Sequence, residues 1–433
     1  MSFFELVEEE VRRFSSGGVS TDGFRISLAE SAKAELGVES NRAGSPYRPL
    51  TVTDLAGGSF LIRWSDGMVS RGALSRTGRD GIREVLESAC EGRYDDPDAA
   101  IFAEACEPVD VPLFSDDTAA VAEGRSPEAL PDLLAVLTDL KEEHGAEVLD
   151  ASGRASRARR RVVTSGGFAG EAESTVFGWS FALDSLVWDG HESREVPGAD
   201  EVGMLARLTA ADYEGLREPA GETPRGEMDV LLHPRVAESF FGTFLYPNLS
   251  GAAVANGRSR FTADDFREGR RVFREDLGIS VRPHVPMSVG AFGFTDEGVC
   301  SREFELIDGG RLTTPTLSLK YARRLEMSPA SLPAAVEGLH FSLNGEIDRE
   351  AALAGGEVVL VHSVMGLHTQ DAVRGEYSVL APQGVLYRDG KAMGRVTATL
   401  NGSFFEDLSS ADLRLVGFPG FAGPGLLVRM TLT

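Results

Sequence analysis

The sequence has 433 residues, more than one small hydrophobic core requires, and this length predicts two or three domains. Its 42% hydrophobic and 25% charged residues are typical of a folded soluble protein. Acidic residues outnumber basic ones by 67 to 43, so the formal net charge is -24. Because like charges repel, this excess argues against general binding to nucleic acid or to an anionic membrane.

The chain contains three cysteines, Cys90, Cys106 and Cys300, which are too few for a disulfide framework. They form no C-x-x-C pair of the kind that marks a structural zinc or a dithiol redox site. The first residues carry acids where a signal peptide needs a basic start, and no stretch approaches the ~18 uninterrupted apolar residues of a membrane span. We therefore expect a cytoplasmic protein in a reducing compartment, without a membrane segment.

The N-terminal part alternates between helical and strand periodicity. Apolar residues first recur at helical spacing and then at every second position, and Asp66-Gly67 is a hairpin signal. The predicted elements are helices at residues 4–14, 81–90 and 127–144 and strands at residues 24–28, 60–64, 155–163 and 174–186.

Residues 91–128 form an acidic loop, with eleven acids against two arginines and with four prolines. This composition predicts an exposed connection with at most one short helix.

The only basic cluster follows at residues 154–161, where five arginines occur. Such a cluster can contact an anion or RNA, or it can form the solvent face of an edge strand, where charge discourages pairing with other chains. The sequence favours the edge strand, because no aromatic residues are interleaved and the background is acidic.

A linker is expected at residues 217–227, and the chain beyond it is rich in glycine and in strand patterns. We predict an α+β fold with an N-terminal α/β sandwich-like domain at 1–220 and a mostly antiparallel, β-rich domain at 221–433. Turn signals at 308–310 and 389–390 predict hairpins. The expected strands lie at 229–232, 290–294, 303–307, 356–362, 375–380, 385–387, 391–400 and 425–432, and the expected helices at 234–245, 263–275 and 315–324.

Standard catalytic signatures are absent from the sequence: it has no phosphate-binding loop, no G-x-S-x-G and no H-E-x-x-H. His191-Glu192 is the only His-Glu pair, and its turn-like context argues against two ligands on one helical face. His362 and His368 could hold a metal with Asp371 if the turn folds back, but His362 is better explained as a packed strand residue.

Two C-terminal segments carry a family resemblance, namely GFTDEGVCSREFELIDGGRLTTPTLSLKYARRL (293–325) and VHSVMGLHTQDAVRGEYSVLAPQGVLYRDGKAMGRV (361–396). Their order resembles the TldD/PmbA family, also called TldD/TldE, which is linked to metallopeptidase activity and to the older label "modulator of DNA gyrase". The resemblance covers residues 229–433, whereas over the first 220 residues it rests only on the order of helices and strands.

Within that family, TldD-type subunits carry H-E-x-x-x-H on the helix after the first strand of this domain, and a late cysteine completes the zinc site. The corresponding segment here, PRVAESFFGTFLYPNLSG, has no histidine, and no cysteine follows Cys300. The chain thus resembles the PmbA/TldE type, the metal-free partner subunit. The resemblance implies no cofactor in this chain and zinc in the partner.

The function implied by the resemblance is that of a non-catalytic subunit of a heterodimeric TldD/TldE-type metallopeptidase that cleaves unfolded or leader peptides. The chain would be inactive alone and active with a TldD-like zinc peptidase. The alternatives are a stand-alone homodimeric peptidase and a non-enzymatic peptide-binding or scaffold protein. The residues expected to line the peptide cavity are Thr295, Asp296, Glu297, Gly298, His362, Gly366, His368 and Thr369.

Overall fold

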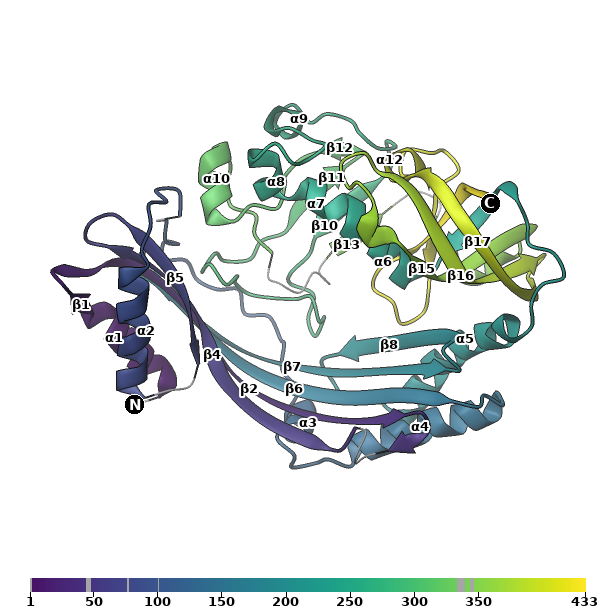
Figure 1. The fold of residues 1–433 in the computed structure, drawn as a ribbon, viewed down its shortest axis with the longest axis horizontal. Helices are drawn as coiled ribbons and strands as arrows, with labels where there is room; N and C mark the ends of the chain where they lie inside the picture. Colours follow the sequence, from purple (N-terminus) through teal and green to yellow (C-terminus); the bar gives the residue numbers. More distant parts are fainter. Residues whose placement is uncertain (1, 44–47, 76–77, 100, 333–338, 343–345) are drawn as a thin grey trace.

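A computed structural model describes residues 2–43, 48–75, 78–99, 101–332, 339–342 and 346–433. A long, curved sheet from the N-terminal half cradles the C-terminal half, and helices lie along the outer side of that sheet (Figure 1). Helices and strands are mixed in both halves, so the predicted α+β class is confirmed. Within the described ranges, no helix combines the length and the apolar character needed to cross a membrane.

The N-terminal sheet is antiparallel, with the strand order β5-β4-β2-β6-β7-β8. Strand β2 extends beyond its predicted end at residue 28, where the buried positions 32 and 34 hold alanine, which gives a weak strand signal. The bounds are β2 (Val19–Glu39), β4 (Thr51–Trp64), β5 (Val69–Ser75), β6 (Leu149–Thr164), β7 (Ala169–Leu183) and β8 (Val187–Ser193), with the short strands β1 (Ser15–Ser16) and β3 (Arg42–Ala43) beside β2.

Four helices cover one face of this sheet, namely α1 (Phe3–Arg13), α2 (Arg79–Glu91), α3 (Asp116–Ala122) and α4 (Ala129–Glu143). Because side chains alternate along a strand, the even-numbered residues of β2 share the face that the helices cover. Along this face, Phe24, Ile26 and Leu28 pack with α1 and α2. Further along the strand, Ala34 and Val38 pack with α3 and α4. The helices predicted at 4–14, 81–90 and 127–144 are therefore confirmed as the outer layer.

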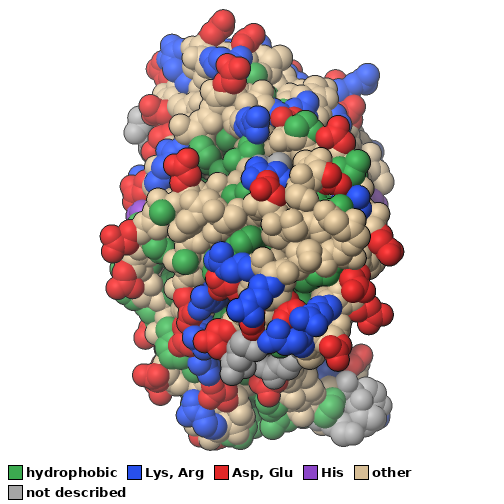
Figure 2. Space-filling view, turned by 90° about the vertical axis from the view of Figure 1, so that its left-hand side faces the viewer, with side chains coloured by type: hydrophobic (Ala, Val, Ile, Leu, Met, Phe, Trp, Pro, Cys, Tyr) green, Lys and Arg blue, Asp and Glu red, His purple; other side chains and the backbone are tan. Residues whose placement is uncertain are grey.

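Ion pairs hold α1 and α2 together at the end of the sheet that faces the viewer in Figure 2, where acidic and basic side chains are interspersed. Glu9 pairs with Arg79 at 2.9 Å, and the buried Glu10 pairs with Arg83 at 2.6 Å. Two acids of α1 are thus paired with arginines of α2.

The arginine cluster does not lie on an edge strand, so that prediction is wrong. Strand β6 runs between β2 and β7 in the middle of the sheet. Its arginines pair with acids on both faces: Arg161 contacts Glu8 of α1 at 3.1 Å, and Arg160 contacts Asp296 of the C-terminal half at 2.6 Å. The cluster therefore joins layers of the protein.

The C-terminal half is built around strands that close on themselves. In the order β9-β15-β16-β17-β19, each strand pairs with the next, and β19 pairs again with β9. Inward residues of all five strands share one hydrophobic core. The strands are β9 (Gly226–Leu232), β15 (Glu357–Met365), β16 (Glu376–Arg388), β17 (Lys391–Ser403) and β19 (Gly425–Leu432), with β14 (Ile347–Asp348) and β18 (Arg414–Gly417) beyond β19.

A second, smaller sheet has the order β12-β11-β10-β13. Its strands are β10 (Gly278–Val281), β11 (Phe304–Asp308), β12 (Arg311–Leu312) and β13 (Leu339–Ser342). The hairpins predicted at Asp66-Gly67, 308–310 and 389–390 are confirmed by the pairs β4–β5, β11–β12 and β16–β17.

The helices of the C-terminal half are short. The helix predicted at 234–245 becomes an α-helix followed by a π-helical turn, and that predicted at 263–275 ends after five residues. The segment 290–294 is a loop rather than a strand, apart from a single bridge between Phe294 and Cys300. The helices are α6 (Pro234–Phe240), α7 (Tyr246–Leu249), α8 (Gly251–Ala255), α9 (Ala263–Arg267), α10 (Leu319–Leu325), α11 (Arg349–Leu353) and α12 (Phe404–Asp407).

Helix α5 (Ala199–Arg217) was not predicted, yet it joins the two halves. It packs against α4 and β8 on one side and against β16 and β17 on the other. Its buried residues share one core with side chains of α4 and with outward-facing residues of β9, β15 and β16. The predicted linker follows it and bonds to the edge of β17, where the Ala220 N–H donates to the carbonyl of Arg395 at 2.8 Å.

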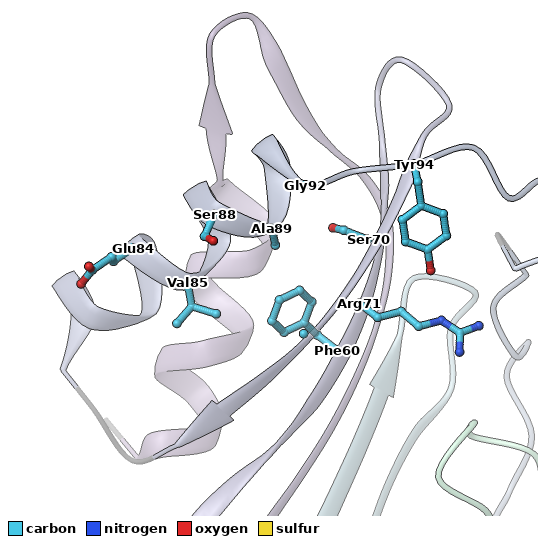
Figure 3. A pocket seen from close by; sticks show the side chains of 10 residues that line it. Phe60, Ser70, Arg71, Glu84, Val85, Ser88, Ala89, Gly92 and Tyr94 are labelled. Atoms are coloured by element: carbon cyan, nitrogen blue, oxygen red, sulfur yellow. The ribbon is translucent and has the colours of Figure 1, made fainter.

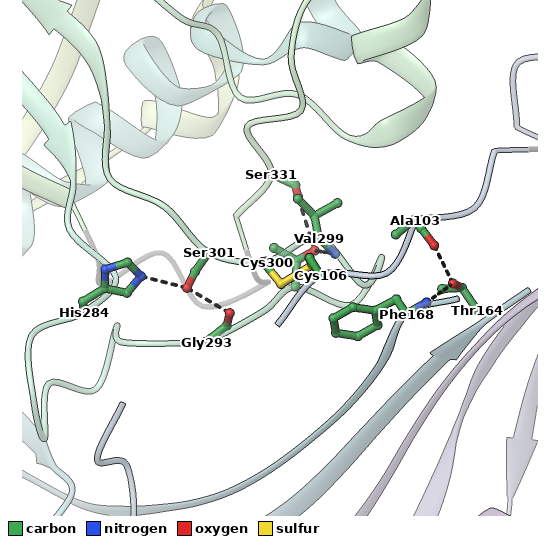
Figure 4. Close-up of a disulfide and its surroundings, with 11 residues drawn as sticks. Ala103, Cys106, Thr164, Phe168, His284, Gly293, Val299, Cys300, Ser301 and Ser331 are labelled. Carbon is green, nitrogen blue, oxygen red and sulfur yellow. Dashed lines mark hydrogen bonds between the residues drawn. A yellow bond between two sulfur atoms is a disulfide. The ribbon is translucent and has the colours of Figure 1, made fainter. Parts of the chain in front are cut away.

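The acidic loop is more buried than predicted. Val111 and Leu113 are buried with Ala291 of the C-terminal half. Cys106 forms a disulfide with Cys300, a pairing that the cysteine count did not predict (Figure 4). The loop therefore lies between the N-terminal sheet and residues 283–301 of the C-terminal half.

Arg194, which follows β8, is buried at the centre of this contact. Its guanidinium donates to the carbonyls of Thr175 (3.0 Å), Ser288 (3.0 Å), Val289 (2.7 Å) and Ala291 (3.3 Å). One side chain thus joins β7 to the C-terminal segment.

Replacing Arg194 with alanine is expected to lower the free energy of unfolding by about 3 kcal/mol or more, because it removes the donor to several buried carbonyls. Arg194→Lys should be intermediate, since one ammonium group cannot span all four acceptors. Urea denaturation measures both effects. Arg207→Ala, which removes only an exposed pair with Glu143, is the control, and equal stability of the two alanine variants would contradict this role of Arg194.

Candidate functional site

Helix α6 carries the segment in which the resemblance described above implies that zinc ligands are missing. It begins directly after β9, and His233 caps it by accepting the N–H of Arg235 at Nδ1 (3.4 Å). Its inner face is apolar, with Val236, Ala237 and Phe240 buried in the C-terminal core. The helix therefore uses its inward positions for packing.

Aromatic rings surround this inner face. Phe240 packs edge-on against Tyr377 with ring centroids 5.1 Å apart, and Phe244 stacks on Phe404 at 5.3 Å. The Tyr377 hydroxyl donates to Asp407 at 2.7 Å, while burial raises the pKa of Asp407 to about 6. The cluster is closely packed around one carboxyl group, that of Asp407.

The side chains at this position do not fit a zinc ion, which requires imidazole, thiolate or carboxylate ligands. Glu238 of α6 is exposed and accepts a hydrogen bond from Tyr246 at 3.0 Å. Cys300 is in the disulfide, and Cys90 is buried in α2. In the part of the chain that the structure describes, no three His, Cys, Asp or Glu side chains are grouped to hold a metal, so no metal-dependent step follows from these residues.

A set of buried charged and imidazole side chains lies close to α6, where β8 and α5 meet the C-terminal strands. We call this set the interface network. It contains two carboxylates, three histidines, two arginines and a tyrosine. Its members are Asp189, His191, Asp212, His233, Arg235, Arg349, His362 and Tyr387.

Asp189 of β8 is the first carboxylate of the interface network and is fully buried. Arg235 of α6 donates to it at 2.9 Å, and Nε2 of His191 lies 3.3 Å from Oδ2. Burial alone would raise the pKa of Asp189, but His191 and Arg235 hold it below the usual value. The carboxylate is therefore ionised and ties β8 to α6.

Asp212 of α5 is the second carboxylate. It pairs with Arg349, accepts the Tyr387 hydroxyl at 2.6 Å, and lies 3.3 Å from Nε2 of His362. Burial would raise the pKa of Asp212, but His362, Arg349 and Tyr387 lower it. All its partners come from the C-terminal half, so this carboxylate fixes α5 to that half.

His233 lies between the two carboxylates among aromatic rings. Its ring centroid is 5.2 Å from that of His362 and about equally close to Phe418 (5.1 Å) and Phe421 (5.0 Å). Burial, followed by the charge of His362, lowers the pKa of His233 to about 3. The imidazole is therefore neutral, which agrees with its role as a hydrogen-bond acceptor.

The chemistry of the interface network is that of a buried ionic lock. Both carboxylates are buried, and each is matched by a cation and by further donors. Neither is a general base open to substrate, since a base needs a free lone pair within reach of the proton it removes. Removing one partner would leave a buried charge uncompensated, which typically costs 3–5 kcal/mol.

The predicted turn at Thr295 to Gly298 contacts the inner face of the N-terminal sheet. Glu297 accepts from Arg25 of β2 at 2.8 Å and from the N–H of Leu319 at 2.7 Å, and Asp296 pairs with Arg160. Thr295 is buried, and Gly298 lies against the ring of Phe168. These four residues clasp the two halves together.

The other four predicted residues lie at the end of β15. The side chain of His362 is buried in the interface network. Gly366, His368 and Thr369 form a surface turn, in which the Thr369 hydroxyl bonds to the carbonyl of Gly366 at 2.8 Å and His368 is exposed. The eight residues thus divide among the clasp, the interface network and the surface turn.

The sequence analysis missed the carboxylates of the interface network. Asp212 lies on the unpredicted α5, whose apolar residues Val202, Leu205, Ala206, Ala210 and Leu216 recur at helical spacing. This periodicity was the available signal. Asp189 gives no comparable signal, because its sequence context, Asp189-Gly190, is that of an ordinary turn.

The neutral state of His233 predicts how the stability of the folded chain depends on pH. Its folded pKa lies below the usual value, so between about pH 6.5 and pH 3 the unfolded chain binds a proton that the folded chain does not. This contribution to stability is present above pH 6.5 and decreases as the pH falls, by up to ~1.4 kcal/mol per pH unit. His233→Phe should flatten the dependence of the melting temperature on pH across this window. His368→Gln, on the surface turn, should keep the wild-type slope; parallel profiles for all three proteins would contradict the prediction.

The C-terminal half matches a known protein family in sequence. The profile of the PmbA/TldA metallopeptidase C-terminal domain matches residues 225–431. An uncharacterized protein of Methanocaldococcus jannaschii is 21% identical over 290 residues, which is 66% of this chain and 68% of that protein.

Solved structures share the fold of the whole chain. TldE from Thermococcus kodakarensis superposes with a TM-score of 0.78 at 17% identity, covering 95% of this chain and 96% of that one. A proposed modulator of DNA gyrase from Thermotoga maritima gives 0.76 at 17% identity, with full coverage of both chains, and one from Bacteroides thetaiotaomicron gives 0.74 at 15%, covering 99% and 96%. With the profile match, these similarities lead to one conclusion: the C-terminal half of the chain matches the PmbA/TldA metallopeptidase C-terminal domain, and the whole chain has the fold of these solved structures.

Proposed function

We propose that this chain is the non-catalytic, metal-free TldE/PmbA-type subunit of a heterodimeric TldD/TldE-type metallopeptidase. The observation that carries the proposal is the inner face of α6, where Val236, Ala237 and Phe240 pack into the core instead of presenting ligands. The similarity of fold to TldE over 95% of the chain supports it. The substrates proposed are unfolded or leader peptides, and the compartment proposed is the cytoplasm.

In the proposed complex, the TldD-like partner holds the zinc that activates water for hydrolysis of the peptide bond. This chain forms part of the cavity wall and restricts entry to extended peptides. Its rigid interface network and clasp hold the two halves in a fixed arrangement, which keeps the shape of that wall constant.

Co-expression with a TldD-type zinc subunit tests the proposal directly. We expect a stable 1:1 complex by size-exclusion chromatography with light scattering, and hydrolysis of an unfolded peptide by the complex. This chain alone should bind no stoichiometric zinc and hydrolyse nothing, while the partner alone is the control for its intrinsic activity. Chelator-resistant hydrolysis by this chain alone would overturn the proposal, and stoichiometric zinc in the lone chain would favour the stand-alone peptidase.

Alanine substitutions at Asp296, Glu297 and His368 are expected to reduce peptide turnover by the complex several-fold, because these residues support the proposed cavity wall. Glu297→Gln should be milder than Glu297→Ala, since its amide oxygen can still accept the Leu319 N–H. Steady-state hydrolysis measures the effect, and Asp412→Ala, which changes an exposed acid in the loop before β18, is the matched control. Unchanged turnover and assembly in all three alanine variants would remove these residues from the proposed wall.

A further inference from the structure

Strand β5 forms an edge of the N-terminal sheet, and part of that edge is open. At its first residue, Val69 exchanges two backbone hydrogen bonds with Tyr94, at 2.8 and 2.9 Å. Because hydrogen-bonding direction alternates along a strand, the N–H and C=O groups of Arg71 and Ala73 point the same way, away from β4. Among the described residues, no backbone partner takes up these groups.

A pocket of about 460 Å³ lies beside this edge, between β5 and α2 (Figure 3). Its floor is the ring of Phe60, which lies over Gly72 because glycine has no side chain there. Its wall on α2 is made of small side chains, which leave the space open. The helix residues that line it are Val85, Ser88 and Ala89, with Glu84 at the rim and Gly92 after the end of the helix.

The open edge and the pocket fit a single kind of occupant. An extended peptide that pairs with β5 turns every second side chain toward the helix-covered face of the sheet. A side chain on that face next to Gly72 would enter the pocket over Phe60, and its size permits a branched aliphatic or aromatic group. Peptide recognition by an edge strand beside a helix is a general mode, in which main-chain bonds give affinity and the pocket gives selectivity.

The charge at the rim selects among such peptides. Glu84 lines the pocket, and Glu87 and Glu91 are exposed on the same helix. Arg71 also lines the pocket, but its guanidinium extends away from α2 in Figure 3. Charge complementarity therefore favours basic residues beside the apolar one.

We propose that the groove between β5 and α2 binds an extended peptide as an added strand, with one apolar side chain in the pocket over Phe60 and a basic neighbour facing Glu84. The site is distinct from the residues assigned to the proposed cavity wall. It is a property of this chain alone, so it goes beyond the proposed role in a heterodimer.

The test uses the full-length chain without any partner and a fluorescently labelled, acetylated and amidated peptide, KVTVKVTK. We expect saturable binding by fluorescence anisotropy. The acidic counterpart DVTVDVTD should bind at least 10-fold more weakly, and Glu84→Lys should reverse this order. Absence of binding of KVTVKVTK up to 1 mM, or equal binding of the two peptides, would overturn the proposal.

Two variants separate the components of the groove. Ala73→Pro removes an outward N–H from the edge while keeping the bonds to β4, and Ser88→Trp fills the pocket. Each should weaken binding at least 10-fold, with an unchanged circular dichroism spectrum. Glu87→Lys, one residue from Ser88 and outside the pocket, is the control and should change binding less than Glu84→Lys.

Wild-type affinity in both Ala73→Pro and Ser88→Trp would overturn the groove as the binding site. The outcome is independent of the heterodimer. Peptide binding by the lone chain can persist when co-expression gives no active complex, and an active complex can form when the groove binds nothing, so a failure of either proposal is recognised separately.

Discussion

A carboxylate buried in a protein interior must be matched by cations or hydrogen-bond donors, because the ionised group otherwise loses its hydration without compensation. This constraint acts twice where the halves of the chain meet. Asp189 on β8 takes its cation from α6, and Asp212 on α5 takes its partners from β15, β16 and α11. The two carboxylates therefore fix the relative position of the curved N-terminal sheet and the closed C-terminal strands, and both Arg194 and the clasp at Glu297 depend on that position.

The need to match the buried Asp189 with a cation also fixes the start of α6, which supplies Arg235. The helix is held at its start by His233 and Arg235, both members of the interface network, and along its inner face by aromatic packing. A segment anchored in this way has a fixed orientation and no inward polar side chain. This chain uses the helix for packing, and the open edge of β5 with the pocket beside it lies at the far end of the N-terminal sheet.

Local patterns predicted local structure well. The helices at α1, α2 and α4 and the three hairpins follow from periodicity and from turn residues, which act over a few positions. The full length of β2 could not be predicted from periodicity. Its residues after position 28 are mostly alanine, serine and charged residues, which form a strand here because they pair with β4 and β6. Strand β6 lies in the middle of the sheet, so its arginines form ion pairs within the protein and are not the solvent face of an edge strand.

The candidate site was less predictable for a related reason. The interface network combines residues from β8, α5, α6, α11, β15 and β16, which are far apart in the chain. Ion pairs between such distant segments produce no regular spacing of residues that a sequence pattern could reveal. His362 was correctly expected to be a packed strand residue, but its partner Asp212 could not be identified without α5. Likewise, the turn at Thr295 to Gly298 was recognised from its residues, whereas its contacts with Arg25 and Arg160 depend on the tertiary fold.

The disulfide between Cys106 and Cys300 has a topological consequence. It closes a covalent ring over a sequence separation of 194 residues, and this ring includes strands β6, β7 and β8 of the N-terminal sheet, helix α5 and the passage into β9. While the bond is intact, a single proteolytic cut anywhere inside the ring leaves one connected molecule, because the severed ends remain tethered through the sulfur atoms. The segment around residue 220, which enters β9 from α5, can then be nicked without releasing either half.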